Sequence, residues 1–203
     1  MNYKILLFSI LLSFNFCFAE KVEIDLAKSQ LTWLGKKVSG QHKGTIKFKS
    51  GYLNIIEDQV KDGEFIIDMT SIENVDIESP EYKKKLEDHL KSNDFFNISE
   101  YAEGKFVIKG LKPAVIPSEM ATIIGELTIK NQTHLIQLPV KINQVNNIFQ
   151  GEAQTTIDRT RWDIRYNSDK FFDPAELGDK LIYNDIEIGL LIITQEAGKT
   201  VAQ

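Results

Sequence analysis

The sequence predicts a mainly β protein, a single antiparallel barrel of about eight strands with one inserted α-helix. Most of the chain consists of short segments in which apolar and polar residues alternate, a pattern typical of strands with one buried face. Gly, Asn and Asp separate these segments, and 203 residues are enough for one domain with its own core. Closure into a barrel removes exposed strand edges, and a β-sandwich is the alternative fold.

Residues 1–19 have the layout of a signal peptide. Lys4 precedes an apolar run over residues 5–12, and the small residue Ala19 ends the segment. We expect cleavage after Ala19, which leaves residues 20–203 as one domain, and export to the periplasm or out of the cell. The apolar run is short for a transmembrane helix, which needs about 20 apolar residues, so an uncleaved anchor is the weaker alternative.

Composition argues against several classes of function. Cys17 is the only cysteine and lies in the expected signal peptide, so the mature protein would have no disulfide, thiol nucleophile or cysteine metal site. The net charge of −5 argues against nucleic acid, which binds to clustered Lys and Arg. The sequence has no nucleophile elbow, phosphate loop or dinucleotide fingerprint, and its histidines lack metal-ligand spacing. We therefore expect a binding protein without catalytic residues, metal or cofactor.

Alternating segments run along most of the expected domain. In residues 63–69 the odd positions are expected to face the core. Ser50 and Gly51 are expected to turn the chain between two neighbouring strands, and the polar link 131–134 predicts a hairpin. The segments expected as strands are 31–34, 45–48, 52–56, 63–69, 105–109, 122–130, 135–142, 148–157 and 182–193.

One segment has the periodicity of a helix. Ser79 is suited to cap it, Pro80 fits its first position, and Glu81 adds a favourable charge to its first turn. The basic run 83–85 could make transient contact with an acidic membrane, but neighbouring acidic residues favour a solvated helix face. The residues that share one stripe, which we expect to dock on the barrel, are Tyr82, Leu86, His89 and Leu90.

The segment 158–166 is expected to be a two-sided strand. Its period of two places three arginines on one face and Trp162 with other apolar residues on the opposite face. Arginines on the outside would form surface ion pairs of about 0–1 kcal/mol each. Arg165, close to the following turn, could instead hold a polar or anionic head group at the barrel mouth. His42 is a second candidate, because two nearby glycines allow close backbone approach at the rim.

Large apolar residues recur on the expected strands. They could line a tunnel or fill a solid core, and periodicity does not separate these outcomes. A filled core is the usual default for apolar stripes. The residues concerned are Trp33, Phe48, Phe65, Ile67, Met69, Phe106, Leu127, Ile129 and Trp162.

Four blocks of the sequence resemble, in order, the YceI-like family. They are the run 31–52, an Asp-x-x-Ser-Ile element at 68–72, a His-Leu-Lys-Ser element within 85–97 and the stretch 125–131. The resemblance implies an exported, lipocalin-like barrel whose apolar interior holds an isoprenoid lipid, either a polyprenyl lipid or an isoprenoid quinone. It also implies that the apolar residues above line the interior and that the head group lies near His42 or Arg165.

The loop 167–181 could cover one mouth of the barrel. Phe171 and Phe172 would then be apolar plugs, and an ordinary packed loop is the alternative. Two rival functions stay open: an interaction barrel with a filled core and, less favoured, a lipid-modifying or metal-dependent enzyme. The sequence does not identify the oligomeric state, and a dimer is compatible with it.

Overall fold

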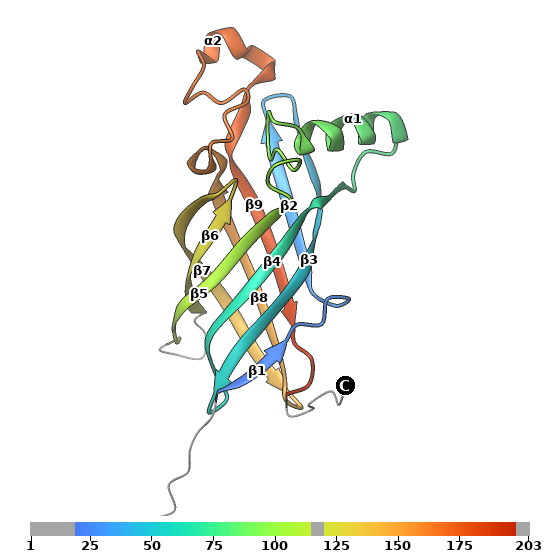
Figure 1. The fold of residues 1–203 in the computed structure, drawn as a ribbon. Helices are drawn as coiled ribbons and strands as arrows, with labels where there is room; N and C mark the ends of the chain where they lie inside the picture. The colour runs from blue at the N-terminus through green and yellow to red at the C-terminus, as the bar shows by residue number, and fades with distance from the viewer. Residues whose placement is uncertain (1–18, 115–119, 198–203) are drawn as a thin grey trace, which may run out of the picture.

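The computed structural model describes residues 19–114 and 120–197 and shows one antiparallel sheet closed into a barrel (Figure 1). The predicted fold class is therefore confirmed. The expected signal peptide, apart from Ala19, lies outside the described residues. The elements are β1 (Glu20–Glu23), β2 (Gln30–Lys37), β3 (Gly40–Ile56), β4 (Gln59–Asn74), α1 (Pro80–Lys91), β5 (Glu103–Lys112), β6 (Ala121–Ile129), β7 (Gln132–Val145), β8 (Ile148–Asp158), η1 (Arg159–Trp162), α2 (Pro174–Leu177), η2 (Gly178–Lys180) and β9 (Ile182–Ile193).

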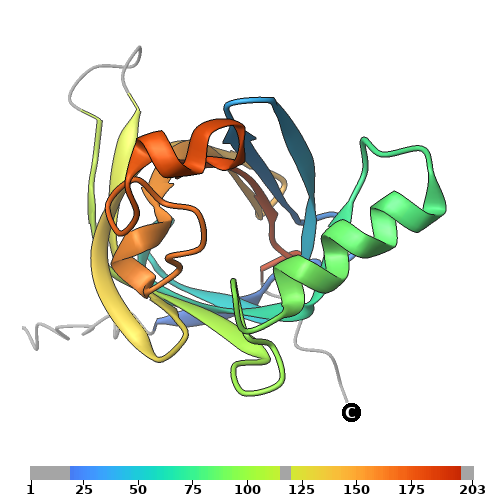
Figure 2. The same cartoon turned by 90° about the horizontal axis from the view of Figure 1, so that it is seen from above.

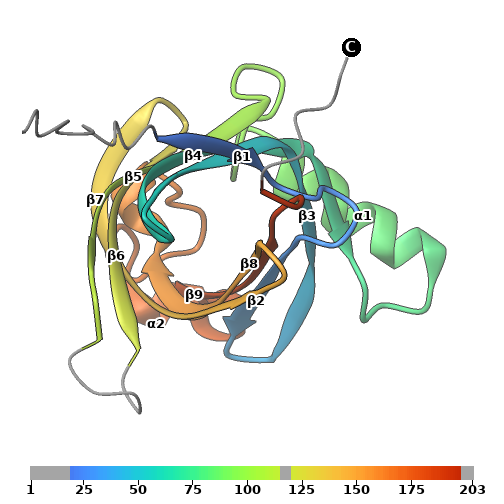
Figure 3. The same ribbon diagram turned by 90° about the horizontal axis from the view of Figure 1, so that it is seen from below.

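The ring closes because β3 pairs on both of its edges. One edge pairs with β4, while the other pairs with β2 over residues 40–46 and with β1 over residues 52–55. From β2 the order continues through β9, β8, β7, β6 and β5 to β4. Figures 2 and 3 look along the barrel axis from its two ends and show this ring. The alternative of a β-sandwich is therefore wrong.

β3 is one long strand, so the expected turn at Ser50 and Gly51 is wrong. Both residues pair with β4, Ser50 with Ile66 and Gly51 with Phe65. The register shifts between Phe48 and Ser50, which marks a bulge. A bulge bends a strand and increases its twist, so the chain curves around the barrel here instead of reversing direction.

The predicted hairpin between β6 and β7 is confirmed, but its turn consists of Lys130 and Asn131, and residues 132–134 of the expected link belong to β7. Both residues have positive φ, 48° and 57°, as a type I′ turn requires. Asn146 and Asn147 join β7 to β8 with φ of 51° and 60°. These turns have the twist of the strands that they connect, so tight hairpins carry the chain around this side of the barrel.

α1 begins at Pro80, as predicted, and lies beside the upper rim of the barrel in Figure 1. Ser79 occupies the N-cap position, but its side chain makes no capping hydrogen bond. Of the expected stripe, Tyr82 is exposed, whereas the later members are half-buried. Neither α1 nor any other helix in the described part of the chain has the length and apolar character needed to span a membrane.

The expected strand over residues 158–166 is wrong, because β8 ends at Asp158 and the 3₁₀ helix η1 follows. The Asp158 carboxylate accepts a hydrogen bond from the Thr160 amide at 2.9 Å, and the helix ends at Asp163 with a φ of 58°. Short polar side chains that bond to nearby backbone groups compete with extended structure. The chain therefore turns at the end of β8.

The barrel wall has a gap between the upper halves of β7 and β8. These strands pair from their shared turn up to Val140 and Ala153, and in the ranges described here no ladder pair joins them beyond that point. Pro139, which precedes Val140 on β7 and lies on the unpaired side, has no N–H to donate to a ladder. Both strands keep their other neighbours, β6 and β9, so the ring remains continuous.

η1 covers this gap. His134 Nε2 lies 2.6 Å from the Arg161 carbonyl oxygen, and the Arg161 guanidinium donates to the Leu135 carbonyl at 3.3 Å. Trp162 is fully buried, and its Nε1–H donates to the Leu127 carbonyl at 3.1 Å. Contacts between side chains and main chain thus take the place of the missing strand pairs.

Two glycines allow aromatic rings to lie close to the barrel wall. A Cβ atom at Gly44 would lie 2.6 Å from the Trp33 ring and 1.9 Å from the Glu73 carbonyl oxygen. A Cβ atom at Gly125 would lie 2.3 Å from the Phe106 ring. Both rings therefore pack over the backbone of a neighbouring strand, which a larger residue would prevent.

We expect Gly44→Ala to lower the free energy of unfolding by about 1–3 kcal/mol, because its methyl group would overlap a backbone carbonyl that cannot move freely. Urea unfolding followed by circular dichroism measures the change. Gly110→Ala is the matched control, since a Cβ atom there meets nothing within 4 Å. Equal stability of the two variants would contradict this account.

Candidate ligand-binding cavity

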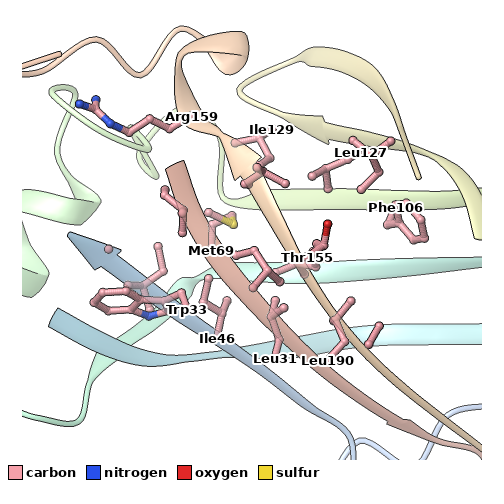
Figure 4. A pocket seen from close by; sticks show the side chains of 18 of the residues that line it. Leu31, Trp33, Ile46, Met69, Phe106, Leu127, Ile129, Thr155, Arg159 and Leu190 are labelled. Carbon is pink, nitrogen blue, oxygen red and sulfur yellow. The ribbon is translucent and has the colours of Figure 1, made fainter. Parts of the chain in front are cut away.

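A cavity of about 490 Å³ runs inside the barrel, and its wall is mostly apolar (Figure 4). Cavities of roughly 300–1,000 Å³ are typical of sites for small molecules. The wall is formed by the inward-facing residues of the strands, with α1 and the loops at one rim. Thr155 on β8 brings one of the few hydroxyl groups to this wall. The arrangement suits a long apolar molecule.

The two ends of the barrel differ. At the end where β3 turns into β4, buried apolar residues form a packed cluster that includes Leu53, Val60 and Phe149. At the opposite rim the cavity is lined by exposed residues, among them Lys37 and Lys180. The cavity therefore has a packed apolar end and reaches the exposed rim at the top of Figure 1.

Most of the apolar residues that the sequence singled out lie on the cavity wall. These residues come from five different strands, and the pleat points each of them inward. They are Trp33, Phe48, Phe65, Ile67, Met69, Phe106, Leu127 and Ile129.

Trp162 is the exception, because it lies in η1 and not on a strand. It packs behind the wall against Leu127, Ile129 and Ile157 and does not line the cavity. Its expected position was derived from a strand period that the chain does not adopt after Asp158. Its role here is to complete the wall.

Arg159 lines the upper part of the cavity and was not singled out as a binding residue by the sequence. Its side chain is 1% exposed, and its guanidinium donates to the main-chain carbonyls of Ile164 at 2.7 Å, Ile182 at 2.9 Å and Tyr183 at 3.2 Å. Burial lowers the pKa of Arg159 to about 10, although the carboxylates of Asp158 and Asp169 act to raise it. The group therefore keeps its positive charge at neutral pH.

His42 lies on the cavity wall at the rim, as the sequence suggested, and belongs to a polar network. Its Nδ1 lies 2.9 Å from Asp76 Oδ2. Asp76 also accepts hydrogen bonds from the Lys43 amide at 2.8 Å and from the fully buried Asn74 at 2.6 Å. Glu87 of α1 accepts a bond from the Asn74 amide at 2.8 Å. This network holds α1 to the rim.

The other residues expected at the mouth lie outside the cavity wall. Arg165 is exposed, forms an ion pair with Asp163, and places its guanidinium 4.9 Å from the centre of the Phe171 ring. Phe171 and Phe172 are 44% and 49% exposed and do not plug the opening. The sequence places Arg165 close to a turn, but closeness to a turn does not determine whether the side chain faces the cavity.

Only the two ends of the loop 167–181 border the cavity. Asn167 lies at one end, and Asp179 and Lys180 lie at the other. His89 of α1 also lines the rim, where it contacts Tyr166 edge to face with the ring centres 4.6 Å apart. The loop borders one side of the opening in Figure 2, and α2, in its middle part, lies above the barrel in Figure 1.

Further lining residues lie on strands that the sequence did predict. Their inward orientation follows from the same period of two, so the alternation extended along each strand predicts them as well. They include Leu31, Ile46, Ile123, Ile136, Leu138, Ile142, Ile186, Ile188, Leu190 and Ile192.

Comparison with known proteins adds two kinds of evidence. The profile of a family described as the YceI-like domain matches residues 23–192. A UPF0312 protein of Staphylococcus epidermidis is 32% identical over 88 residues, which are 40% of this chain and 47% of that protein. The chain thus spans about half the length of the curated relatives that it matches.

Solved structures share the fold at low sequence identity. BcnA of Burkholderia cenocepacia matches with a TM-score of 0.68 and 19% identity, covering 85% of this chain and 99% of that one. A structure from Saccharophagus degradans, described as a polyisoprenoid binding domain implicated in plant cell wall breakdown, has a TM-score of 0.60 and 11% identity, with 88% and 99% covered. At these identities the likeness shows the fold alone.

We expect acid to weaken the fold through Asp76. Burial acts to raise its pKa, but the bonds from the Lys43 amide, His42 and Asn74 outweigh this, and the pKa of Asp76 lies below its ordinary value. A lowered pKa in the folded state adds stability above the unfolded pKa of about 4, and this stability is lost as the pH falls through the folded value.

Asp76→Asn should therefore unfold more easily than the wild type at neutral pH, and the difference should shrink below about pH 4. Urea unfolding at a series of pH values checks this. Asp185→Asn is the control, because Asp185 is exposed and, among the described residues, its carboxylate makes no hydrogen bond or ion pair. A difference that stays constant with pH would argue against the role of the carboxylate.

Proposed function

Because this chain belongs to the YceI-like domain family, we propose that it is an isoprenoid-binding protein that shields a long hydrocarbon chain from water inside the barrel. The observation that carries the proposal is the elongated apolar cavity of about 490 Å³, which is packed at one end and reaches an exposed rim at the other. The neighbour from Saccharophagus degradans, described as a polyisoprenoid binding domain, supports the ligand class.

The physical chemistry of the wall suits such a ligand. Burial of hydrocarbon gains about 0.8 kcal/mol for each CH₂ group and requires no specific polar partner. The wall offers isoleucine, leucine and phenylalanine side chains from all around the ring. A barrel with a filled core would have no such cavity, so the cavity favours a carrier. The proposal assigns no catalytic residue, metal or cofactor.

We test the function by extracting the protein, purified without detergent from its native envelope, and identifying the extract by mass spectrometry. A stoichiometric isoprenoid is expected, and an unrelated exported protein is the control. Thr155→Phe, which fills part of the cavity, should bind the lipid about tenfold more weakly and retain less of it on purification, since displacing two CH₂ groups costs roughly 1.6 kcal/mol.

Thr156→Phe is the matched variant, because Thr156 is the next residue on β8 and faces outward. It should keep its lipid. Equal lipid content in the two variants, or an extract no richer than the control protein, would reject binding inside the barrel.

We also propose that residues 1–19 are removed on export, so that the mature chain begins at Glu20, the first residue of β1. The intact mass of the protein from the envelope fraction should match residues 20–203. The full-length mass, or recovery from the cytoplasm alone, would refute the export proposal without affecting the cavity.

A further inference from the structure

Several inward-facing rows of the barrel end in a basic residue at the same rim. On β2 the row begins with Leu31 and ends with Lys37. On β8 the row begins with Phe149, and Arg159, the first residue of η1, continues it at the upper end. The row of β3 ends with His42, which pairs with Gly35 of β2. Each row is apolar over most of its length and basic at its upper end.

The charge of the cavity wall is opposite to that of the protein. The chain has 29 acidic and 24 basic Lys or Arg residues, yet Asp179 is the only carboxylate on the cavity wall in the described structure. The basic residues on this wall are Lys36, Lys37, His42, His89, Arg159 and Lys180.

Three of these basic residues already have carboxylate partners. Lys36 pairs with Glu187, and the two histidines pair with Asp76 and Asp94. The other three are Lys37, Arg159 and Lys180. In the described part of the chain, no carboxylate lies within ion-pair distance of them.

The three unpaired cations gather around Ile182 in one sector of the rim. Ile182 is the register partner of Lys37, and its carbonyl accepts a hydrogen bond from Arg159 at 2.9 Å. Lys180 precedes it by two positions on η2. The Val38 amide donates to the Leu181 carbonyl at 3.1 Å, which holds the β2–β3 hairpin against this segment. Figure 2 shows the blue hairpin meeting the orange-red loop at this point.

We propose that this sector is a subsite for an anionic head group, a phosphate or a carboxylate, at the end of the isoprenoid chain; the proposal rests on the function proposed above. Lys37 and Lys180 are exposed and contact the anion directly. Arg159 is almost fully covered and acts as a fixed positive charge behind them. Asp158 and Asp169 interact with Arg159 but form no ion pair with it, and Asp158 is paired with Lys170. A buried charge acts through a medium of low dielectric constant, so Arg159 favours an anion at the rim.

The anion is expected to be the head group of the lipid, because the cations lie at the end of the apolar wall. A head group held here would leave its hydrocarbon chain in line with the cavity, and the two parts would bind together. Free phosphate lacks the apolar part and would bind only through exposed lysines, where contacts are weak. The structure therefore selects among isoprenoid lipids by the charge of the head group.

The test compares three ligands that share a geranylgeranyl tail and carry a phosphate, a carboxylate or a hydroxyl group. Dissociation constants are measured by titration calorimetry on delipidated protein at low ionic strength. We expect both anions to bind about tenfold more tightly than the alcohol, with the difference shrinking in salt. Inorganic phosphate is titrated alongside and is expected not to compete.

The double variant Lys37→Gln/Lys180→Gln should reduce the ratio of anion affinity to alcohol affinity from about tenfold to about twofold, because only the charge of Arg159 remains. Lys112→Gln/Lys141→Gln is the matched control, because it removes two exposed lysines that lie away from the cavity wall. It should keep the preference for anions.

The outcomes separate the two proposals. If all three ligands bind equally to the wild type, the anion subsite is wrong while the isoprenoid carrier stands. If none binds, the carrier proposal fails and the subsite fails with it. A preference for anions that is undiminished in the Lys37/Lys180 variant, or inorganic phosphate that binds as tightly as the lipid phosphate, also overturns the subsite.

Discussion

Closure of the sheet on itself is the constraint on which the rest of this structure depends. Once β3 pairs with β4 on one edge and with β1 and β2 on the other, every second side chain of the ring points inward. Eight strands leave an interior that is either filled by side chains or wide enough for one small ligand. Here Gly44 and Gly125 let the rings of Trp33 and Phe106 pack against the wall, which keeps the middle of the barrel open.

The two ends of the ring have different chemistry, and this gives the cavity a direction. Buried apolar residues pack at the β3–β4 turn, while polar networks and η1 form the opposite rim. The main-chain carbonyls at the start of β9 hold the Arg159 guanidinium there without a carboxylate. A molecule inside this barrel therefore meets a gradient from hydrocarbon to charge along the strand axis.

The period of two was informative wherever pairing was regular, and it predicted most of the cavity wall and all the strands except β1. The prediction failed after Asp158, where a hydrogen bond from the Thr160 amide to the Asp158 carboxylate favours a 3₁₀ helix over a strand. As a result, Trp162 lies behind the wall. Ser50 and Gly51 have turn-forming composition, but long-range pairing with β4 overrides it. Arg159 could not be found from the sequence, because the carbonyls that bury it belong to segments that only the fold brings close.

The short helix η1 has a consequence for the behaviour of the protein in solution. Above Val140 and Ala153 the facing edges of β7 and β8 have no ladder partner, and unpaired strand edges can recruit strands from other molecules. Arg161 donates to the Leu135 carbonyl of β7, and Trp162 donates to the Leu127 carbonyl of the neighbouring strand β6, so η1 is held over these edges. A strand from another molecule would have to displace η1 before it could pair with these edges.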